Sequence, residues 1–178
     1  NLNGCPVQCA YNIGQFVGAV DGAQSFIANR TAYLSAVRFY MTKNGAPPNA
    51  TIRIFGNRRI YTTGASAGSP CAAGVTANGC MDLPATTNMI DAAILHASDV
   101  SIPEGIVTLF FTTPVRPLIM NEKYWVVFDS NCPTSGCSSG TEGWILKAPQ
   151  PSVSFSTVTS DPDYTGKDSE RDLTYYTD

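Results

Sequence analysis

The sequence predicts an all-β fold, a sandwich or a barrel, on two observations. Apolar and polar residues alternate in short runs, which is the period of a strand with one buried face. Clusters of Gly, Pro, Asn and Asp separate these runs at the spacing of turns between strands. Six cysteines fall in three local pairs along the 178 residues. We count roughly ten or eleven expected strands and, because the composition does not shift along the chain, one sandwich domain.

The alternation is clearest in residues 34–41, where Val37, Phe39 and Met41 share one face of the expected strand. Residues 88–98 fit a helix as well as they fit a strand followed by a turn. The other expected strands are residues 51–55, 106–112, 124–128, 152–158 and 173–176.

Disulfides are the expected state of the cysteines, because an even number in local pairs is typical of proteins from an oxidising compartment. The two longest irregular stretches, residues 57–84 and 131–141, each contain one pair, and a short bridge would stiffen such a loop. The alternative is a zinc site, but the spacings are not those of a zinc knuckle and His96 is the single histidine. The expected disulfides are Cys5–Cys9, Cys71–Cys80 and Cys132–Cys137.

The composition argues against two kinds of partner. Charged residues make up 14% of the chain, its net charge is -3, and it has no basic run. A nucleic-acid binder needs a basic face, so no nucleic acid is expected. No apolar run approaches the ~20 residues of a membrane-spanning helix, so no membrane span is expected. The chain begins at Asn1 without a methionine, and we expect a mature extracellular protein whose leader has been removed.

A series of short segments resembles a known family. Their order is similar to that of the jelly-roll β-sandwich domains of prokaryotic cell-surface proteins, which are often labelled by their variable anchors and resemble carbohydrate-binding modules. The resemblance spans residues 10–178 and implies a jelly-roll-like antiparallel β-sandwich, here with disulfide-pinned loops. The same sandwich serves binding, adhesion and assembly, so it implies no single function. The segments are AQSFIA (23–28), LSAVRFY (34–40), GAP (45–47), ATIRI (50–54), VTLFF (107–111), PV (114–115), KYWVV (123–127) and DLTYY (172–176).

No catalytic site is expected. His96 is the single histidine, and the chain has no nucleophile motif and no phosphate-binding loop. Carboxylates such as Glu104 and Glu122 lie in turn-like segments, where solvated turn residues are a simpler interpretation than a glycosidase pair. We therefore expect a structural or binding module rather than an enzyme.

Calcium is the cofactor that the sequence suggests. Residues 161–172 carry Asp at positions 1, 3 and 12 and Gly at position 6 of an EF-hand-like spacing. The loop has Thr at position 5, ends in Asp instead of Glu, and is flanked by expected strands. The alternatives are a calcium site of oxygen ligands and a metal-free Asx-rich turn. The ligands would be Asp161, Asp163, Thr165, Asp168 and Asp172.

Aromatic residues offer a sugar-binding platform. Trp125 lies in an apolar run and is expected in the core, whereas Trp144 follows the last cysteine pair. An exposed Trp144 would stack on a sugar ring, with Tyr164 or Tyr61 as a second platform. The alternative is a partly buried tryptophan on an edge strand.

Two N-x-T sequons predict a glycoprotein. Asn29 and Asn49 each begin a sequon at the edge or turn of an expected strand, where a glycan would project into solvent. The alternative is a chance match, since the chain is rich in Asn and Thr.

The N-terminal stretch predicts self-assembly. We divide the chain into residues 1–22, an N-terminal strand or extension, and residues 23–178, the sandwich domain. Residues 11–17 alternate and carry no charge, so they either add to the sheet of a neighbouring copy or form the first strand of their own sheet. The assembly strand would use Tyr11, Ile13, Gln15, Phe16 and Val17.

These patterns lead to one expected function and two alternatives. We expect a structural subunit of an extracellular assembly, such as a filament, a pilus-like fibre or a surface layer, whose partners are copies of itself in a homopolymer. A carbohydrate-binding or adhesive module, with glycans as partners, is the alternative from a different class. A virion or tail decoration protein shares the mechanism of the first and is not separated from it by sequence.

Overall fold

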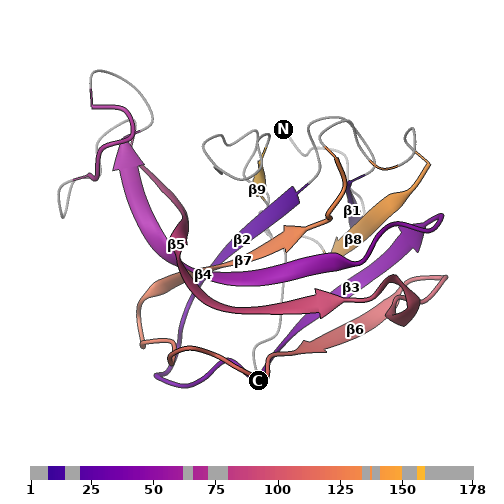
Figure 1. Cartoon of the computed structure of the whole chain (residues 1–178), viewed down its shortest axis with the longest axis horizontal. Helices are drawn as coiled ribbons and strands as arrows, with labels where there is room; N and C mark the ends of the chain where they lie inside the picture. The colour runs from indigo at the N-terminus through magenta and orange to yellow at the C-terminus, as the bar shows by residue number, and fades with distance from the viewer. Residues whose placement is uncertain are drawn as a thin grey trace.

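The computed structural model of the chain describes residues 8–14, 21–61, 66–71, 80–133, 137, 141–149 and 156–158. These residues form nine β-strands and one short 3-10 helix (Figure 1). The predicted all-β fold is confirmed. No helix in the described residues is long and apolar enough to cross a membrane. The elements are β1 (Gln8–Ile13), β2 (Asp21–Ile27), β3 (Ala36–Asn44), β4 (Ala50–Tyr61), β5 (Cys80–Leu95), η1 (Ala97–Asp99), β6 (Gly105–Phe110), β7 (Lys123–Asp129), β8 (Gly143–Pro149) and β9 (Ser156–Val158).

The strands form two antiparallel sheets. The order is β1-β8-β3-β6 in the four-stranded sheet and β5-β4-β7-β2-β9 in the five-stranded sheet. The pairs β1–β8, β2–β7, β3–β6 and β4–β5 are nested in chain order. This nested pairing of strands in two sheets is the connectivity expected of a jelly roll, which contains two Greek keys. The finer assignment as a jelly roll stays a prediction, which the nested pairing supports.

The main core lies between the two sheets. Val37, Phe39 and Met41 of β3 are buried in it, as their alternation predicts. Phe128 of the five-stranded sheet packs edge-to-face on Phe39 and on Trp144 of the four-stranded sheet, with ring centroids 5.9 and 5.7 Å apart. Burying one large apolar side chain contributes about 1.5–3 kcal/mol, so these rings hold the two sheets together.

A second buried cluster lies on the opposite face of the five-stranded sheet. Trp125 and Val127 of β7 join Ala23 and Phe55 there, while their neighbours in β7 face the main core. Alternate residues of a strand point to opposite faces, so β7 is buried on both. Trp125 is buried, as predicted, but on this outer face rather than between the sheets.

The hairpin of β4 and β5 corrects the two ends of the irregular stretch predicted over residues 57–84, since residues 57–61 and 80–84 are strand. The two strands pair from Ala50 and Leu95 to Tyr61 and Cys80. Pairing across the hairpin orders a segment whose own composition is typical of a loop. Register shifts next to Phe55 mark a bulge, and the pairing of β4 with β7 ends at Gly56. One end of the hairpin curves away from the other strands (Figure 1).

Three other predicted elements have different outcomes. Of the two interpretations of residues 88–98, the strand followed by a turn is confirmed, since β5 runs to Leu95 and η1 follows it. Of the expected strand over residues 152–158, the structure has β9 at Ser156–Val158. The expected strand over residues 173–176 lies outside the described residues.

Two of the three expected disulfides are present, Cys71–Cys80 and Cys132–Cys137. The first lies at the loop end of the β4–β5 hairpin and joins Cys71 to the first residue of β5. The N–H of Cys71 also donates to the carbonyl of Arg59 at 3.0 Å. Cys5 lies outside the described residues, so the third disulfide stays a prediction.

Candidate functional site

The edge of the four-stranded sheet at β6 is open. Among the described residues, β3 is the one strand that pairs with β6. The β6 sequence, GIVTLF, contains no charged residue and no proline. Ile106 and Phe110 are 72% and 67% exposed, and Tyr40, directly opposite Ile106 on β3, is also exposed. Exposed apolar side chains beside unpaired main chain are typical of a strand edge that pairs with another chain.

The ladder between β3 and β6 shows which main-chain groups of β6 face away from β3 and so have no partner strand in the described part of the chain. The N–H of Phe111 donates to the carbonyl of Ser35 at 2.9 Å, just beyond the end of the strand pair. Hydrogen-bonded and non-hydrogen-bonded pairs alternate along an antiparallel ladder. The N–H and C=O groups of Ile106, Thr108 and Phe110 therefore point away from β3, towards the open edge.

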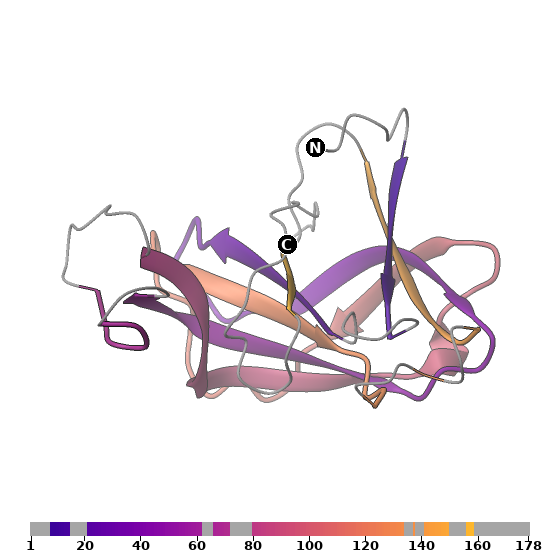
Figure 2. The same cartoon turned by 90° about the horizontal axis from the view of Figure 1, so that it is seen from above.

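The other edge of this sheet is β1, where part of the predicted assembly strand lies. Tyr11 and Ile13 belong to β1, which pairs with β8 of its own chain (Figure 2). Ile13 is fully buried in the main core. The predicted boundary between residues 22 and 23 falls inside β2, so the sandwich includes strands from both sides of it. Gln15, Phe16 and Val17 lie outside the described residues.

The end of β1 is fastened to the loop of the second disulfide. The N–H of Cys137 donates to the carbonyl of Gly14 at 2.7 Å. Gly14 has a φ of +78°, and a Cβ there would lie 2.6 Å from the Sγ of Cys132. Only glycine fits this contact, which holds β1 in its own sheet. Exchange of residues 1–22 between subunits stays a prediction.

The edges of the five-stranded sheet are constructed differently. β9 has three residues, and a very short edge strand offers little main chain for pairing. β5 contains Pro84 and the bulge, and it buries Asp91, which is 5% exposed. The Oδ1 of Asp91 accepts a hydrogen bond from the N–H of Ala92 at 2.8 Å. A proline, a bulge and an inward-pointing charge each protect an edge strand from pairing.

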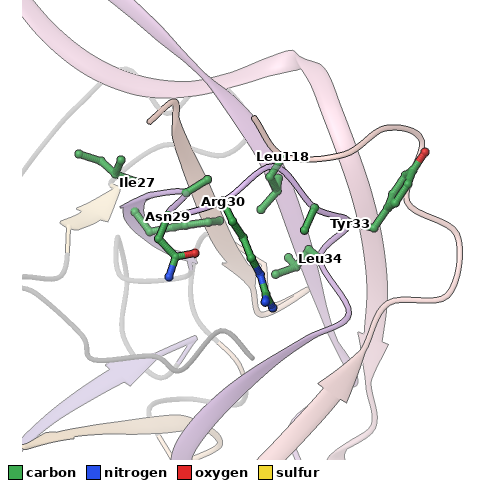
Figure 3. A pocket seen from close by; sticks show the side chains of 9 residues that line it. Ile27, Asn29, Arg30, Tyr33, Leu34 and Leu118 are labelled. Atoms are coloured by element: carbon green, nitrogen blue, oxygen red, sulfur yellow. The ribbon is translucent and has the colours of Figure 1, made fainter. Parts of the chain in front are cut away.

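A pocket of about 270 Å³ lies beside the loop between β2 and β3 (Figure 3). Its wall is held by main-chain bonds in both directions between Ala32 and Leu118. Arg30 extends beside Leu34, whereas Tyr33 points outward at one end and is 62% exposed. The lining combines one cation, an amide and an aromatic ring with apolar side chains. It is formed by Phe26, Ile27, Ala28, Asn29, Arg30, Ala32, Tyr33, Leu34 and Leu118.

Tyr124 fixes the turn next to this pocket. Its hydroxyl accepts a hydrogen bond from the N–H of Ile119 at 2.8 Å and donates one to Glu122 at 3.0 Å. Burial raises the pKa of Tyr124, and the bond to Glu122 raises it further. The phenol therefore stays protonated and keeps donating at neutral pH.

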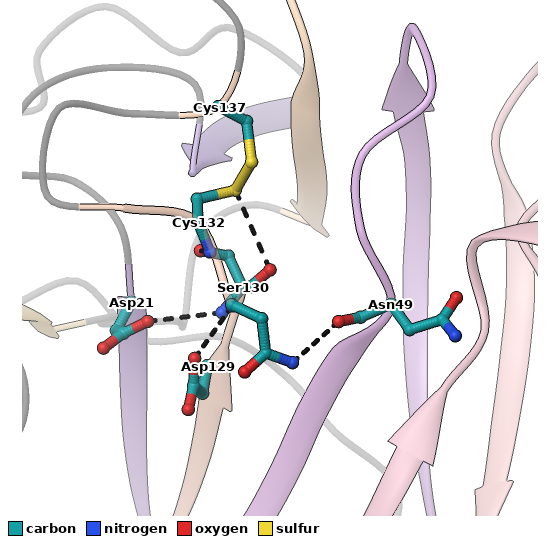
Figure 4. The surroundings of a disulfide bond; sticks show 7 residues. Asp21, Asn49, Asp129, Ser130, Cys132 and Cys137 are labelled. Atoms are coloured by element: carbon teal, nitrogen blue, oxygen red, sulfur yellow. Dashed lines mark hydrogen bonds between the residues drawn. A yellow bond between two sulfur atoms is a disulfide. The ribbon is translucent and has the colours of Figure 1, made fainter.

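The Cys132–Cys137 disulfide sits in a polar network that joins the ends of three strands (Figure 4). The N–H of Ser130 donates to Asp21 at 3.2 Å, and the N–H of Asn131 donates to Asp129 at 2.8 Å. The side-chain amide of Asn131 donates to the carbonyl of Asn49 at 2.7 Å. These contacts are consistent with a structural role for the disulfide loop.

The two sequon asparagines are exposed. Asn29 lines the pocket. The Oδ1 of Asn49 accepts from the N–H of Ala97 at 3.0 Å, and its amide nitrogen lies 3.1 Å from the Nδ1 of His96. A glycan on Asn49 would replace one hydrogen of that amide. Occupancy of both sequons stays a prediction.

Polar side chains connect three strands on the outer face of the five-stranded sheet. The indole N–H of Trp125 donates to Asn57 at 2.8 Å, and Asn57 donates to Asp82 at 2.9 Å. Lys123 completes the chain with an ion pair to Asp82 at 2.5 Å. Burial acts to raise the pKa of Asp82, but the bonds from Lys123 and Asn57 outweigh it and lower the pKa below 3.8. Arg53 forms a further ion pair with Asp129.

The predicted sugar platform at Trp144 is wrong. Trp144 is 0% exposed and packs on Phe128 between the sheets, because the pairing of β8 with β1 and β3 turns it to the inner face. Tyr164 and the predicted calcium ligands Asp161, Asp163, Thr165, Asp168 and Asp172 lie outside the described residues. Within the described part of the chain, no cluster of His, Cys, Asp or Glu has the arrangement of a metal site.

Comparison with known proteins identifies no family for this chain. No family model matches the chain, and no curated protein matches it. A solved structure, a CocE/NonD family hydrolase from Staphylococcus aureus, is similar at a TM-score of 0.34 and 9% sequence identity. The match covers 80% of this chain and 30% of the hydrolase, so this chain spans less than a third of that protein.

Proposed function

We propose that the chain is a non-enzymatic structural subunit of an extracellular assembly, a filament, pilus-like fibre or surface layer. Copies of the chain join by main-chain pairing at the edges of the four-stranded sheet. The β6 edge is the observation that carries this proposal, because it combines unpaired main chain with exposed Ile106 and Phe110 and has none of the usual protecting residues. Strand addition of this kind gives affinity through backbone hydrogen bonds.

The extracellular location is part of the same proposal. Two disulfides close short loops of a domain that already has a large apolar core. Disulfides persist in oxidising compartments and are rare in the cytosol. A low charged fraction, 14%, also favours close packing of copies, since fewer charges lose water at each contact.

Assembly is tested by size measurements on the whole chain. Electron microscopy and sedimentation should show polymers whose length grows with protein concentration. Thr108→Pro removes an N–H that faces the open edge and spares the ladder to β3, so we expect a folded monomer. Thr108→Val keeps that N–H and should assemble like the original chain. A wild-type protein that stays monomeric at millimolar concentration would contradict the proposal.

The pocket favours a second function, carbohydrate binding. Tyr33 offers an exposed ring for stacking on a sugar, and Arg30 adds donors for sugar hydroxyls or a carboxylate. In this proposal Tyr33 is the aromatic platform for a sugar ring, the role for which the sequence suggested Trp144. A glycan array with the original chain and with Tyr33→Ala and Arg30→Ala tests it. Binding that both substitutions leave intact, or no binding at all, would count against this function.

A further inference from the structure

We infer that the interface between subunits, called the joint below, is head-to-tail: β6 of one copy pairs antiparallel with β1 of the next copy. The four-stranded sheets of successive copies then continue as one sheet. This inference rests on the proposed assembly and specifies its joint. Three features of the four-stranded sheet support it. They are the direction of the strands, the positions along each edge strand whose N–H and C=O groups point outward, and the composition of the two edges.

Strand direction comes first. Each neighbouring pair in the order β1-β8-β3-β6 is antiparallel. An even number of alternating strands leaves the two edge strands pointing in opposite directions. A second copy placed beside the first in the same orientation therefore brings its β1 antiparallel to β6. No subunit has to be turned over to make the joint.

The positions of the outward-pointing main-chain groups also agree with this joint. Because hydrogen-bonded pairs alternate along each ladder, the bonds from β3 to β6 fix those from β3 to β8 and from β8 to β1. They place Gln8 opposite Pro149 in a pair that exchanges no hydrogen bond, which suits proline because it has no N–H. The N–H and C=O groups of Gln8, Ala10 and Asn12 therefore face away from β8, towards the edge where β1 has no second partner strand among the described residues.

The two edges also match in register and in face. Asn12 lies on the opposite face from Ile13, and Thr108 lies on the opposite face from Val107, and both Ile13 and Val107 are buried in the core. At Asn12 and Thr108, the main-chain groups that face the edges thus belong to residues on the outer face. An antiparallel joint that pairs them keeps the cores of successive copies on the same side. Its register is Ile106–Asn12, Thr108–Ala10 and Phe110–Gln8.

The composition of the edges allows this contact. β1 and β6 are both six residues long, and neither contains Lys, Arg, His, Asp, Glu or Pro. No charge has to be desolvated in the joint. One kind of joint occupies both edges, and a head-to-tail contact repeats into an open chain when its rotation does not close. A two-fold joint between two β6 strands would leave both β1 edges unused.

A mixing experiment tests the joint. Asn12→Pro blocks the β1 edge and Thr108→Pro blocks the β6 edge, each at an outward-facing N–H. A head-to-tail joint predicts that each variant alone is monomeric and that an equimolar mixture forms a heterodimer through the two remaining edges. Sedimentation and native mass spectrometry measure this. Circular dichroism checks the fold of each variant, and Asn12→Lys with Ile106→Lys repeats the design if a proline variant does not fold.

The outcomes separate this inference from the proposed function. A dimer of Asn12→Pro alone would mean a joint between two β6 strands, which overturns the head-to-tail joint and leaves edge assembly standing. A mixture that stays monomeric while the original chain polymerises would also overturn it, because the joint then lies elsewhere. An original chain that never polymerises would remove the proposed function itself. A heterodimer that forms in the mixture and in neither variant alone supports the inference.

Discussion

The β5 and β6 edges belong to the same sandwich, but the β5 edge is protected from pairing with another strand and the β6 edge is not. β5 has a proline, a bulge and the buried Asp91 in its 16 residues, whereas β6 has none of these in its six. Both strands expose an isoleucine, Ile94 at 56% and Ile106 at 72%. Exposed apolar residues therefore do not distinguish the two edges. The difference lies in the main chain, which β5 protects from pairing and β6 leaves regular.

This contrast explains why assembly is assigned to one sheet. An edge strand that pairs with another chain needs a regular ladder, because each bulge or proline removes a donor or breaks the register. β6 and β1 satisfy this need, and β5 and β9 do not. The five-stranded sheet instead holds the ion pairs of Asp82 and Asp129, which stabilise the subunit. Under the proposed assembly, the four-stranded sheet provides both edges that join copies, and neither edge of the five-stranded sheet takes part.

The largest expected effect comes from Trp144, which packs in the core between the two sheets. Trp144→Ala should lower the free energy of unfolding by about 3–5 kcal/mol, because it leaves a cavity between Phe128 and the four-stranded sheet. Thermal unfolding should show a melting temperature roughly 10–15 °C lower. Trp144→Phe is the control and should recover most of the loss. A melting temperature unchanged in Trp144→Ala would contradict the buried position of this residue.

The next effect separates the two edges directly. Ile106→Lys should raise the concentration needed for polymerisation by roughly 100-fold, since a lysine on an edge strand hinders pairing. The matched variant Ile94→Lys places the same charge on β5 and should change that concentration by less than about two-fold. Both sites are exposed, so each variant should unfold within about 0.5 kcal/mol of the original chain. Equal effects of the two lysines would remove the distinction between the edges.

The sequence predicts much of the fold because the signal for each strand is local. The alternation of Val37, Phe39 and Met41 places their burial on one face, and the structure confirms it. The same method fails for the β4–β5 hairpin, since Arg58 and Pro84 look like loop residues until their partners across the hairpin are known. Two disulfides were predicted for a related reason, because their partners are close in sequence.

The candidate site was harder to predict because it depends on which strand lies at an edge. The local pattern predicts a strand over residues 106–112, but it does not indicate that, among the described strands, β6 pairs with one neighbour instead of two. Trp144 was misplaced for the same reason, since its face depends on the register of β8 with β1 and β3. The lack of charge in GIVTLF is the signal that was available for the open edge.

A smaller effect is expected when the buried carboxylate of Asp91 on β5 is removed. Asp91→Val removes a buried carboxylate whose Oδ2 has no hydrogen-bond partner among the described residues. We expect the variant to be more stable by about 1–2 kcal/mol in urea unfolding, because burying a charge with few partners costs free energy. Its β5 edge still has Pro84 and the bulge, so polymerisation should not change. A less stable variant would show that Asp91 stabilises the fold and does not act mainly as a protecting charge.

The smallest effect concerns the ion pair between Asp82 and Lys123. Because the pKa of Asp82 is lower in the folded chain than its ordinary value of 3.8, this pair stabilises the fold above that pH. The stabilisation is lost as the pH falls through the lowered pKa. Both side chains are partly exposed, so we expect Asp82→Asn to cost less than about 1 kcal/mol at pH 7. The melting temperatures of the variant and the original chain should converge as the pH falls from 5 to about 3. In a Lys123→Met background the same substitution should have a smaller effect, and a gap that widens in acid would reverse the sign assigned to Asp82.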